Sequence, residues 1–294
     1  SQLDATAYWN GERASYETDA GWNRTNMTNY MYHLGDEYPP YGDGEFTGIY
    51  GYDPSQAWSD WGYQQNFATD SAAAGSAMST GQKTYKGSIC WSLDGEPMEN
   101  LVDYADARGK ATGVVTSVML SHATPASYVA HNPARGNYAE IAQEMVASPL
   151  DVIMGAGHPD YDHNGEPAPG DPADPGDWKY VGGHDQWQAL QAGTAGGDEP
   201  WTLVEEKMDF EALASGDLLP ERVFGCAKVG YTLQHDRAGY PAFNAADAPY
   251  EDPFIDTVPS LETMTRGALN VLGQDPEGFL VMVEGGAVDW AGHG

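Results

Sequence analysis

The sequence predicts an α/β fold built on a large, mainly parallel central sheet flanked by helices. Residues 100–108 carry apolar side chains at helical spacing, and the apolar, β-branched run 111–120 follows them. The same order recurs when the helical pattern of 138–146 is followed by the strand pattern of 150–154. Alternation of this kind is typical of parallel sheets, because two parallel neighbours need a crossover connection that a helix can supply.

Three further segments extend this pattern toward the end of the chain. Residues 222–227 and 278–283 are apolar enough to form strands, the second being the last of the sheet. Between them, residues 260–272 show the spacing of an amphipathic helix with Ser260 as its cap. We find no internal repeat and no flexible linker, so we expect one domain over residues 1–294.

Two stretches are expected to be mostly loops. Residues 1–65 are rich in Tyr, Trp, Gly, Asp and Asn, with a helix expected only over 3–13. Residues 158–200 are rich in Pro, Gly and Asp and predict a surface insertion with one helix near 185–190. Oxygen-bearing side chains alternate within this insertion, at Asp160, Asp162, Asn164 and Glu166. They lack the glycine and final glutamate of an EF-hand loop in register, which favours a solvated loop over a calcium site.

Composition bounds the partners and the environment. The 294 residues include 41% hydrophobic ones, enough for a sizeable core, and 13 basic against 44 acidic residues give a net charge of −31. Nucleic acid and anionic membranes are therefore unsuitable partners, and no apolar run approaches the ~20 residues of a membrane span. An acidic surface of this kind indicates a saline habitat. If the protein lost its fold when the salt concentration was raised, this expectation would be contradicted. Some carboxylates could instead be metal ligands.

The two cysteines, Cys90 and Cys226, are far apart in the sequence. They would form a disulfide in an oxidising compartment or remain two buried thiols, and their spacing leaves both alternatives open.

Small residues after Asp70 predict a short helix that starts at or just before Ser71 and ends near Gly81. A serine at a helix N-terminus lies beside unpaired backbone N–H groups and the positive end of the helix dipole. That position suits a hydroxyl that must carry negative charge or meet an anion. The alternative is that Ser71 or Asp70 only caps a buried, alanine-rich helix.

A second group of polar residues follows the last predicted strand. Glu284 stands at the strand end, and Asp289 and His293 are four residues apart beyond a Gly-Gly break. On a helical turn the latter two share one face, where both could bind one divalent ion, while Glu284 could hold a harder cation such as Mg²⁺. The alternative is an ordinary surface pair.

A third group follows the strand that ends at Leu120. It contains His122 and Thr124, with His131 and Arg135 farther along. In a chain so poor in arginine, one guanidinium beside hydroxyl and imidazole groups indicates an anionic ligand, because its fork fits phosphate bidentately. The alternative for Thr124 and the following Pro125 is a plain helix start.

The three groups, in this order and at these spacings, resemble the alkaline phosphatase family, particularly its marine and salt-tolerant bacterial branch. The motifs are Asp70-Ser71-Ala72, then His122-Ala123-Thr124-Pro125 with Arg135, then Glu284, Asp289 and His293. The resemblance covers most of the chain. It implies a three-layer sandwich, hydrolysis of small phosphate monoesters, a homodimer, and a periplasmic or extracellular location.

The resemblance also implies the roles of the residues that handle phosphate. Ser71 is similar to the nucleophile, which forms a phosphoseryl intermediate, and Arg135 to the arginine that binds the phosphoryl group. Asp70 is similar to the residue that orients this arginine. His122, which stands where the enterobacterial form has Asp, is expected to take part in substrate binding beside Arg135.

The cofactors implied are two Zn²⁺ ions and one Mg²⁺ ion. Asp289 and His293 resemble ligands of the first zinc, with Ser71 held by zinc as an alkoxide. Thr124 and Glu284 resemble ligands of magnesium. Trp290 stands where the enterobacterial form has Lys, a departure that bears on how tightly phosphate is bound.

Other parts of the family pattern are missing. A first strand ending in Gly-Asp-Gly would precede Ser1, and the Asp-His pair of the second zinc with a last His of the first would follow Gly294. We therefore expect a fragment that lacks both ends of its catalytic domain and is itself inactive.

Three other functions stay open at this point. One is a phosphodiesterase or sulfatase of the same superfamily, and another is a metal-free serine hydrolase, although no Gly-x-Ser-x-Gly elbow surrounds Ser71. The third, if the chain is complete as given, is a catalytically inactive protein that binds phosphate or divalent cations.

Overall fold

The computed structural model describes residues 70–92, 94–235 and 254–293. The chain divides into two compact units, which are described in turn. The first is Ser1–Asn100 with His131–Asn137, and the second is Leu101–Ala130 with Tyr138–Gly294. The helix expected over 3–13 lies outside the described residues.

A parallel sheet forms the centre of the second unit. Its strands are β1 (Ala111–Met119), β2 (Val152–Ala156), β3 (Thr202–Val204), β4 (Val223–Cys226) and β5 (Phe279–Glu284). They are arranged in the order β3-β4-β2-β1-β5, and each described pairing is parallel. The predicted α/β fold with a mainly parallel sheet is confirmed. All carboxyl ends therefore lie along the same edge of the sheet, where ligands gather in folds of this kind.

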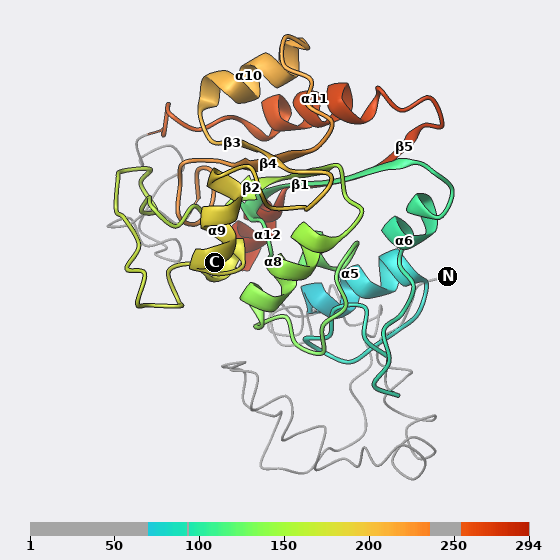
Figure 1. Cartoon of the computed structure of the whole chain (residues 1–294). Helices are drawn as coiled ribbons and strands as arrows, with labels where there is room; N and C mark the ends of the chain where they lie inside the picture. Colours follow the sequence, from blue (N-terminus) through green and yellow to red (C-terminus); the bar gives the residue numbers. More distant parts are fainter. Residues whose placement is uncertain (1–69, 93, 236–253, 294) are drawn as a thin grey trace, which may run out of the picture. The chain divides into compact units, whose positions relative to one another are not determined.

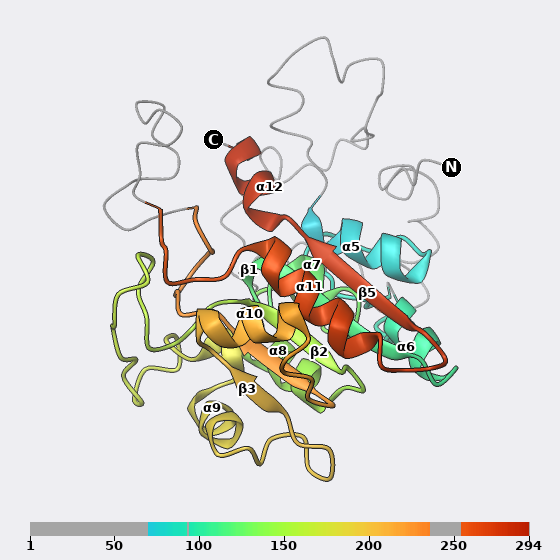
Figure 2. The same cartoon turned by 90° about the horizontal axis from the view of Figure 1, so that it is seen from above.

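Helices cover both faces of this sheet. They are α6 (Leu101–Asp106), α7 (Ala123–Ala126), α8 (Tyr138–Ala147), α9 (His184–Gln191), α10 (Lys207–Ser215), α11 (Leu261–Leu272) and α12 (Gly286–His293), with the 3₁₀ helix η1 (Lys179–Val181). Helices α10 and α11 lie side by side on one face, and α6 and α8 lie on the opposite face (Figures 1 and 2). The result is three layers.

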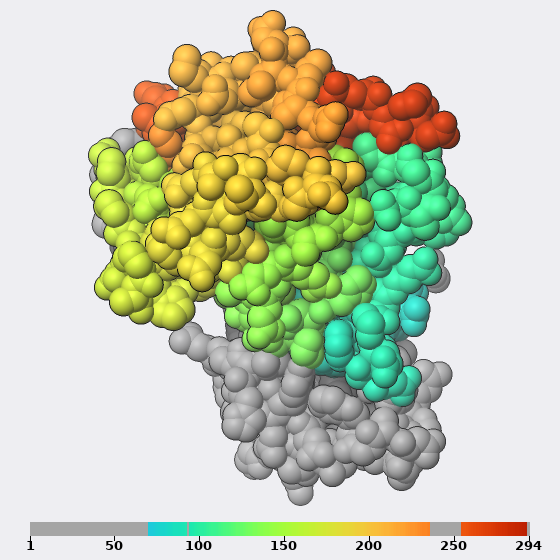
Figure 3. Space-filling view, viewed as in Figure 1, coloured from blue at the N-terminus to red at the C-terminus, as the bar shows by residue number. Residues whose placement is uncertain are grey.

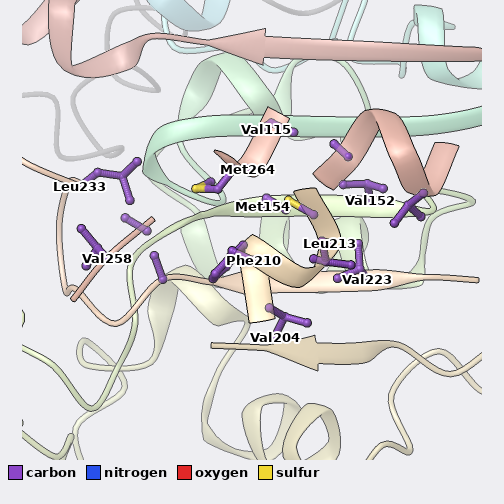
Figure 4. Packing of buried hydrophobic residues seen from close by; sticks show 14 of the residues in the cluster. Val115, Val152, Met154, Val204, Phe210, Leu213, Val223, Leu233, Val258 and Met264 are labelled. Atoms are coloured by element: carbon purple, nitrogen blue, oxygen red, sulfur yellow. The ribbon is translucent and has the colours of Figure 1, made fainter. Parts of the chain in front are cut away.

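The main core fills the space between the sheet and α10 with α11. Phe210 and Leu213 of α10 belong to this core together with Val152 and Val223 of the strands, and Leu213 lies beside Val223 (Figure 4). Glycine at position 225 of β4 lets the helix approach closely, because a Cβ there would lie 2.6 Å from Cε1 of Phe210. The aromatic ring thus packs directly on the strand backbone, and burial of such side chains stabilises the layer by roughly 1.5–3 kcal/mol each.

Most predicted elements are present within a few residues of their expected bounds. The cap of α11 is confirmed, because Ser260 Oγ accepts a hydrogen bond of 3.0 Å from the Thr263 amide. The sequence analysis missed α10 and the short strand β3, which is only three residues long. Residues 158–200 contain η1 and α9, and they make up a broad yellow-green to yellow part of the surface in Figure 3.

The first unit contains α5 (Ser71–Thr80), which ends at Gly81 in the left-handed region with φ of 73°. Buried Ser76 ties this helix to the next loop, since its hydroxyl donates to Ser88 O and accepts from the Cys90 amide. Cys90 and Cys226 are both buried, and neither forms a disulfide within the described part of the chain, so the structure favours two thiols over a disulfide. Among the described helices, none is long and apolar enough to cross a bilayer.

Candidate active site

Asp70 caps the helix that begins with Ser71. Its Oδ2 accepts hydrogen bonds from the Ala73 amide at 3.1 Å and from the Gly87 amide at 2.8 Å. The first bond satisfies one of the N–H groups that a helix start leaves unpaired. The predicted helix start is confirmed, and Asp70 is the cap.

The same carboxylate binds Arg135. Arg135 Nη1 donates to Asp70 Oδ1 at 2.5 Å, and the side chains are 21% and 7% exposed, respectively. The backbone of Arg135 is also fixed, because its amide donates to Gly87 O at 2.7 Å. One carboxylate therefore holds both the helix start and the guanidinium, which places the positive charge beside the residue that precedes Ser71 in the chain.

The ionisation of Asp70 follows from these contacts. Burial by itself would raise the pKa of this carboxyl, but the Arg135 guanidinium and the amides of Gly87 and Ala73 outweigh it. The pKa of Asp70 therefore lies below its ordinary value of 3.8. Asp70 is ionised at neutral pH, and its charge is neutralised by a partner that is itself partly exposed.

We expect Asp70→Asn to lower the stability of the protein at pH 7, with the difference shrinking in acid. A group whose folded pKa is lowered contributes stability above its unfolded pKa and loses that contribution as pH falls through the folded value. The difference in urea midpoint between wild type and Asp70→Asn should therefore decrease below pH 3.8. Asp185→Asn, at a fully exposed side chain, is the control. A difference that stays constant from pH 7 to pH 2.5 would contradict this account.

Ser71 is the first residue of α5 and is half-buried. Its hydroxyl forms no hydrogen bond with another residue in the described part of the chain, whereas its neighbour Asp70 is fully engaged. An N-terminal helix position surrounds this hydroxyl with backbone N–H groups and positive dipole charge. Ser71 thus directly follows the residue that pairs with Arg135 in the first unit, and its role as nucleophile stays a prediction.

The second unit holds the remaining candidate residues at the carboxyl edge of its sheet. Glu284 ends β5, and its Oε2 accepts a hydrogen bond of 2.6 Å from Thr116 Oγ1 on the neighbouring strand β1. Thr116 is 1% exposed. The parallel register that pairs Thr116 with Glu284 fixes the carboxylate, whose Oε1 has no hydrogen-bond partner among the described residues.

His122 and Thr124 belong to the turn after β1. His122 occupies the N-cap position of α7 without a side-chain capping bond, and Thr124 is the second residue of this helix. Pro125 is the third residue of α7, so the helix does not begin at the proline and that alternative is wrong. Next to them, the buried Ser121 hydroxyl has no hydrogen-bond partner among the residues that the structure describes. An unpaired buried hydroxyl is uncommon. This turn is therefore polar and contains a hydroxyl whose hydrogen-bonding capacity is not used.

Asp289 and His293 lie on α12, four residues apart. The start of α12 is fixed to β1, because the Ala287 amide donates to Ser117 Oγ at 3.2 Å. Trp290, next to Asp289, meets the ring of His122 edge to face with centroids 5.4 Å apart. The structure thus brings the segments of His122 and Asp289 together. The His293 side chain is not among the described groups.

The available donor types fit the cations that the resemblance implies. Carboxylate and hydroxyl oxygens at Glu284 and Thr124 suit Mg²⁺, and a carboxylate with an imidazole one helical turn away, at Asp289 and His293, suits Zn²⁺. Within the described residues, however, no three His, Cys, Asp or Glu side chains form a group that could hold a metal ion. These residues therefore match the implied cations in the type of donor atom that they offer.

A match to a family model shows to which protein family the chain belongs. The model described as alkaline phosphatase matches residues 54–294, well over half of the chain. The chain belongs to the alkaline phosphatase family. Members of this family act on phosphate esters.

Known alkaline phosphatases resemble the chain over about three quarters of its length. Alkaline phosphatase 3 of Bacillus subtilis is 32% identical over 237 residues, which cover 78% of this chain and 41% of that protein. Alkaline phosphatase of Escherichia coli is 28% identical over 251 residues, 78% of this chain and 50% of that protein. The chain spans about half the length, or less, of these curated relatives.

The solved structure of Thermus thermophilus alkaline phosphatase matches with a TM-score of 0.52 and 29% identity, covering 74% of this chain and 38% of that one. The cold-active alkaline phosphatase of a psychrophilic Shewanella species matches with a TM-score of 0.56 over 93% of this chain and 56% of that one. Its identity is 24%, so it supports the fold alone.

Sequence reasoning missed two residues that contact members of the candidate site. Thr116 was counted only as part of a strand, because its role depends on which strand pairs with β1 and in what register. Tyr138 was counted as a helix residue, although its ring stacks on His122 with centroids 5.7 Å apart and planes 13° apart. Both contacts join residues far apart in the chain, and local patterns carry no signal for them.

Proposed function

We propose that the protein hydrolyses phosphate monoesters through a phosphoserine intermediate on Ser71 and releases inorganic phosphate. The observation that carries this proposal is the Asp70–Arg135 pair at the helix start that bears Ser71. A nucleophile, an oriented guanidinium and helix N–H groups together match the needs of phosphoryl transfer, in which charge develops on the oxygens of phosphorus.

The chain's own residues divide the work. The guanidinium of Arg135 binds two phosphoryl oxygens in a bidentate way, and Asp70 keeps it in that orientation. Ser71 Oγ forms a bond to phosphorus while the bond from phosphorus to the ester oxygen breaks, and the alcohol leaves with a proton. Water then attacks the phosphoserine, which restores the serine hydroxyl and releases phosphate.

Asp289 and His293 would hold zinc, and Thr124 and Glu284 would hold magnesium. Metal ions bound there would supply positive charge and lower the pKa of a coordinated oxygen. Thr116 keeps the Glu284 carboxylate in place for this purpose, since its hydroxyl donates to one of the two oxygens.

The test uses the protein isolated from its natural source, whose intact mass is measured first because relatives are about twice as long. We expect turnover of a phosphate monoester at a rate at least a hundredfold above that of a diester or a sulfate ester. Treatment with a chelator should abolish turnover, and zinc with magnesium should restore it. Activity that survives the chelator would indicate a metal-free hydrolase, and preference for the diester or the sulfate would overturn the proposal.

A further inference from the structure

Arg135 lies on a tight turn of the first unit, formed by residues 134–137. The Asn137 amide donates to Ala134 O at 3.1 Å, which closes the turn with Arg135 and Gly136 as its central residues. The backbone of Arg135 therefore belongs to neither a helix nor a strand. A long side chain on such a turn has many orientations, and to fix one of them costs conformational entropy.

One buried side chain spans both ends of this turn. Asn132 is 6% exposed, and its Oδ1 accepts a hydrogen bond of 2.9 Å from the Ala134 amide and one of 3.0 Å from Asn137 Nδ2. The first donor precedes Arg135 by one residue, and the second follows it by two. A single oxygen atom thus fixes the turn on both sides of the arginine, in addition to the backbone bond that closes it.

The backbone of Asn132 is itself anchored. It pairs with Ile89 in an antiparallel bridge, in which the two residues exchange hydrogen bonds of 2.8 and 2.9 Å. Two residues before Ile89, Gly87 donates to the Asp70 carboxylate and accepts from the Arg135 amide. One short segment of chain therefore holds Asp70, Asn132 and Arg135, so a shift of the turn would move the guanidinium relative to the carboxylate.

A second buried side chain holds the segment that leads into the turn. Tyr85 is 6% exposed, and its hydroxyl donates to Pro133 O at 3.1 Å. Proline also fixes φ at its own position, which stiffens this segment further. Tyr85 therefore supports the same turn as Asn132 through a separate hydrogen bond.

We propose that Asn132 is a positioning residue for phosphate, because it holds the turn that carries Arg135 and so keeps the guanidinium in the orientation that binds phosphate. This inference rests on the proposed function, which assigns Arg135 to the phosphoryl oxygens. Asp70 fixes the guanidinium end of the side chain, and Asn132 fixes the backbone end. A guanidinium held at both ends loses less entropy when it binds an anion, which raises the affinity.

The experiment uses the full-length natural protein and measures the dissociation constant of inorganic phosphate by calorimetry, with kcat and KM for phenyl phosphate. We expect Asn132→Ala to raise the dissociation constant and KM about tenfold, because the guanidinium loses its orientation, while kcat changes less than about threefold. Tyr85→Phe removes one hydroxyl and should raise both about threefold. This conservative variant tests the proposal even if Asn132→Ala does not fold.

Asn270→Ala is the matched control. Asn270 on α11 also makes two hydrogen bonds to another segment, since its Nδ2 donates to Leu213 O and Ala214 O at 2.9 and 3.0 Å. Its loss should lower the urea midpoint and leave the phosphate dissociation constant unchanged. If Asn132→Ala gave this same result, its role would be structural only and the proposal would be overturned.

A double-mutant cycle separates the positioning of Arg135 from any other effect on phosphate. In an Arg135→Ala background, Asn132→Ala should weaken phosphate binding by less than about twofold, because the group that it positions is gone. Additive effects of the two substitutions would overturn the proposal and leave the proposed function standing. Unchanged phosphate affinity in Arg135→Ala alone would count against the proposed function, and therefore also against the inference that rests on it.

Discussion

Ser71→Ala is expected to reduce kcat for a phosphate monoester by roughly 10³-fold or more, since removal of a nucleophile costs at least this much in comparable enzymes. The serine hydroxyl is the only atom of this side chain that can attack phosphorus, and alanine keeps the helix start otherwise intact. Asp70 supplies the cap through its own carboxylate, so the substitution leaves the capping bond to Ala73 in place. The measurement is the steady-state rate, together with acid-quenched capture of radiolabelled phosphate on the protein.

Controls separate loss of the nucleophile from loss of the fold. Thr80→Ala removes a hydroxyl at the far end of the same helix, where it donates to Ser76 O, and should keep activity near that of wild type. The Ser71→Ala protein should unfold at the wild-type urea concentration and incorporate no phosphate. Ser71→Ala activity within tenfold of wild type would exclude Ser71 as the nucleophile and leave its position at the helix start as a structural one.

The parts of the fold that could be predicted are those with strong local patterns. The strand β1 and helix α11 have long runs whose spacing matches one element, and Ser260 adds a cap signal in the right place. In contrast, β3 has only three residues, and α10 has few buried positions, with Phe210 and Leu213 as its buried members. Such short segments gain their structure from packing on the sheet, which a local window of sequence does not record.

The residues of the candidate site also divide into those with a local sequence signal and those that depend on long-range pairing. Ser71 and Asp70 were predictable, because a helix start and its cap are local features. Arg135 was found through its rarity in an acidic chain and through family resemblance, although its 2.5 Å contact with Asp70 spans 65 positions in sequence. Thr116 was not predictable, since only the register of β1 with β5 brings its hydroxyl to Glu284. Long-range pairing is therefore what the structure adds to this site.

Arg222→Leu is expected to destabilise the second unit by about 3–5 kcal/mol, a large part of the stability of an ordinary domain. Arg222 is buried directly before β4, and its guanidinium donates to three backbone carbonyls, those of Ser148, Leu150 and Glu199, at 2.8–2.9 Å. It also lies 3.9 Å from the ring of Trp201, whose own N–H is bonded to Val146 O. Leucine would fill much of the volume but leave three carbonyl acceptors without this donor, and one of them, that of Leu150, belongs to a fully buried residue.

Arg266→Leu provides the matched control for this change. Arg266 is two-thirds exposed and, within the described ranges, pairs only with Glu262 one turn away on α11, a contact worth roughly 0.3–0.5 kcal/mol. The urea midpoint should therefore fall steeply for Arg222→Leu and hardly at all for Arg266→Leu. Arg222→Lys should lie between them, because lysine retains the charge but cannot reach three carbonyls with a planar fork. A loss below 1 kcal/mol for Arg222→Leu would mean that water replaces the guanidinium at these carbonyls, and that the edge formed by β4 and the loop before β2 is more open than its burial indicates.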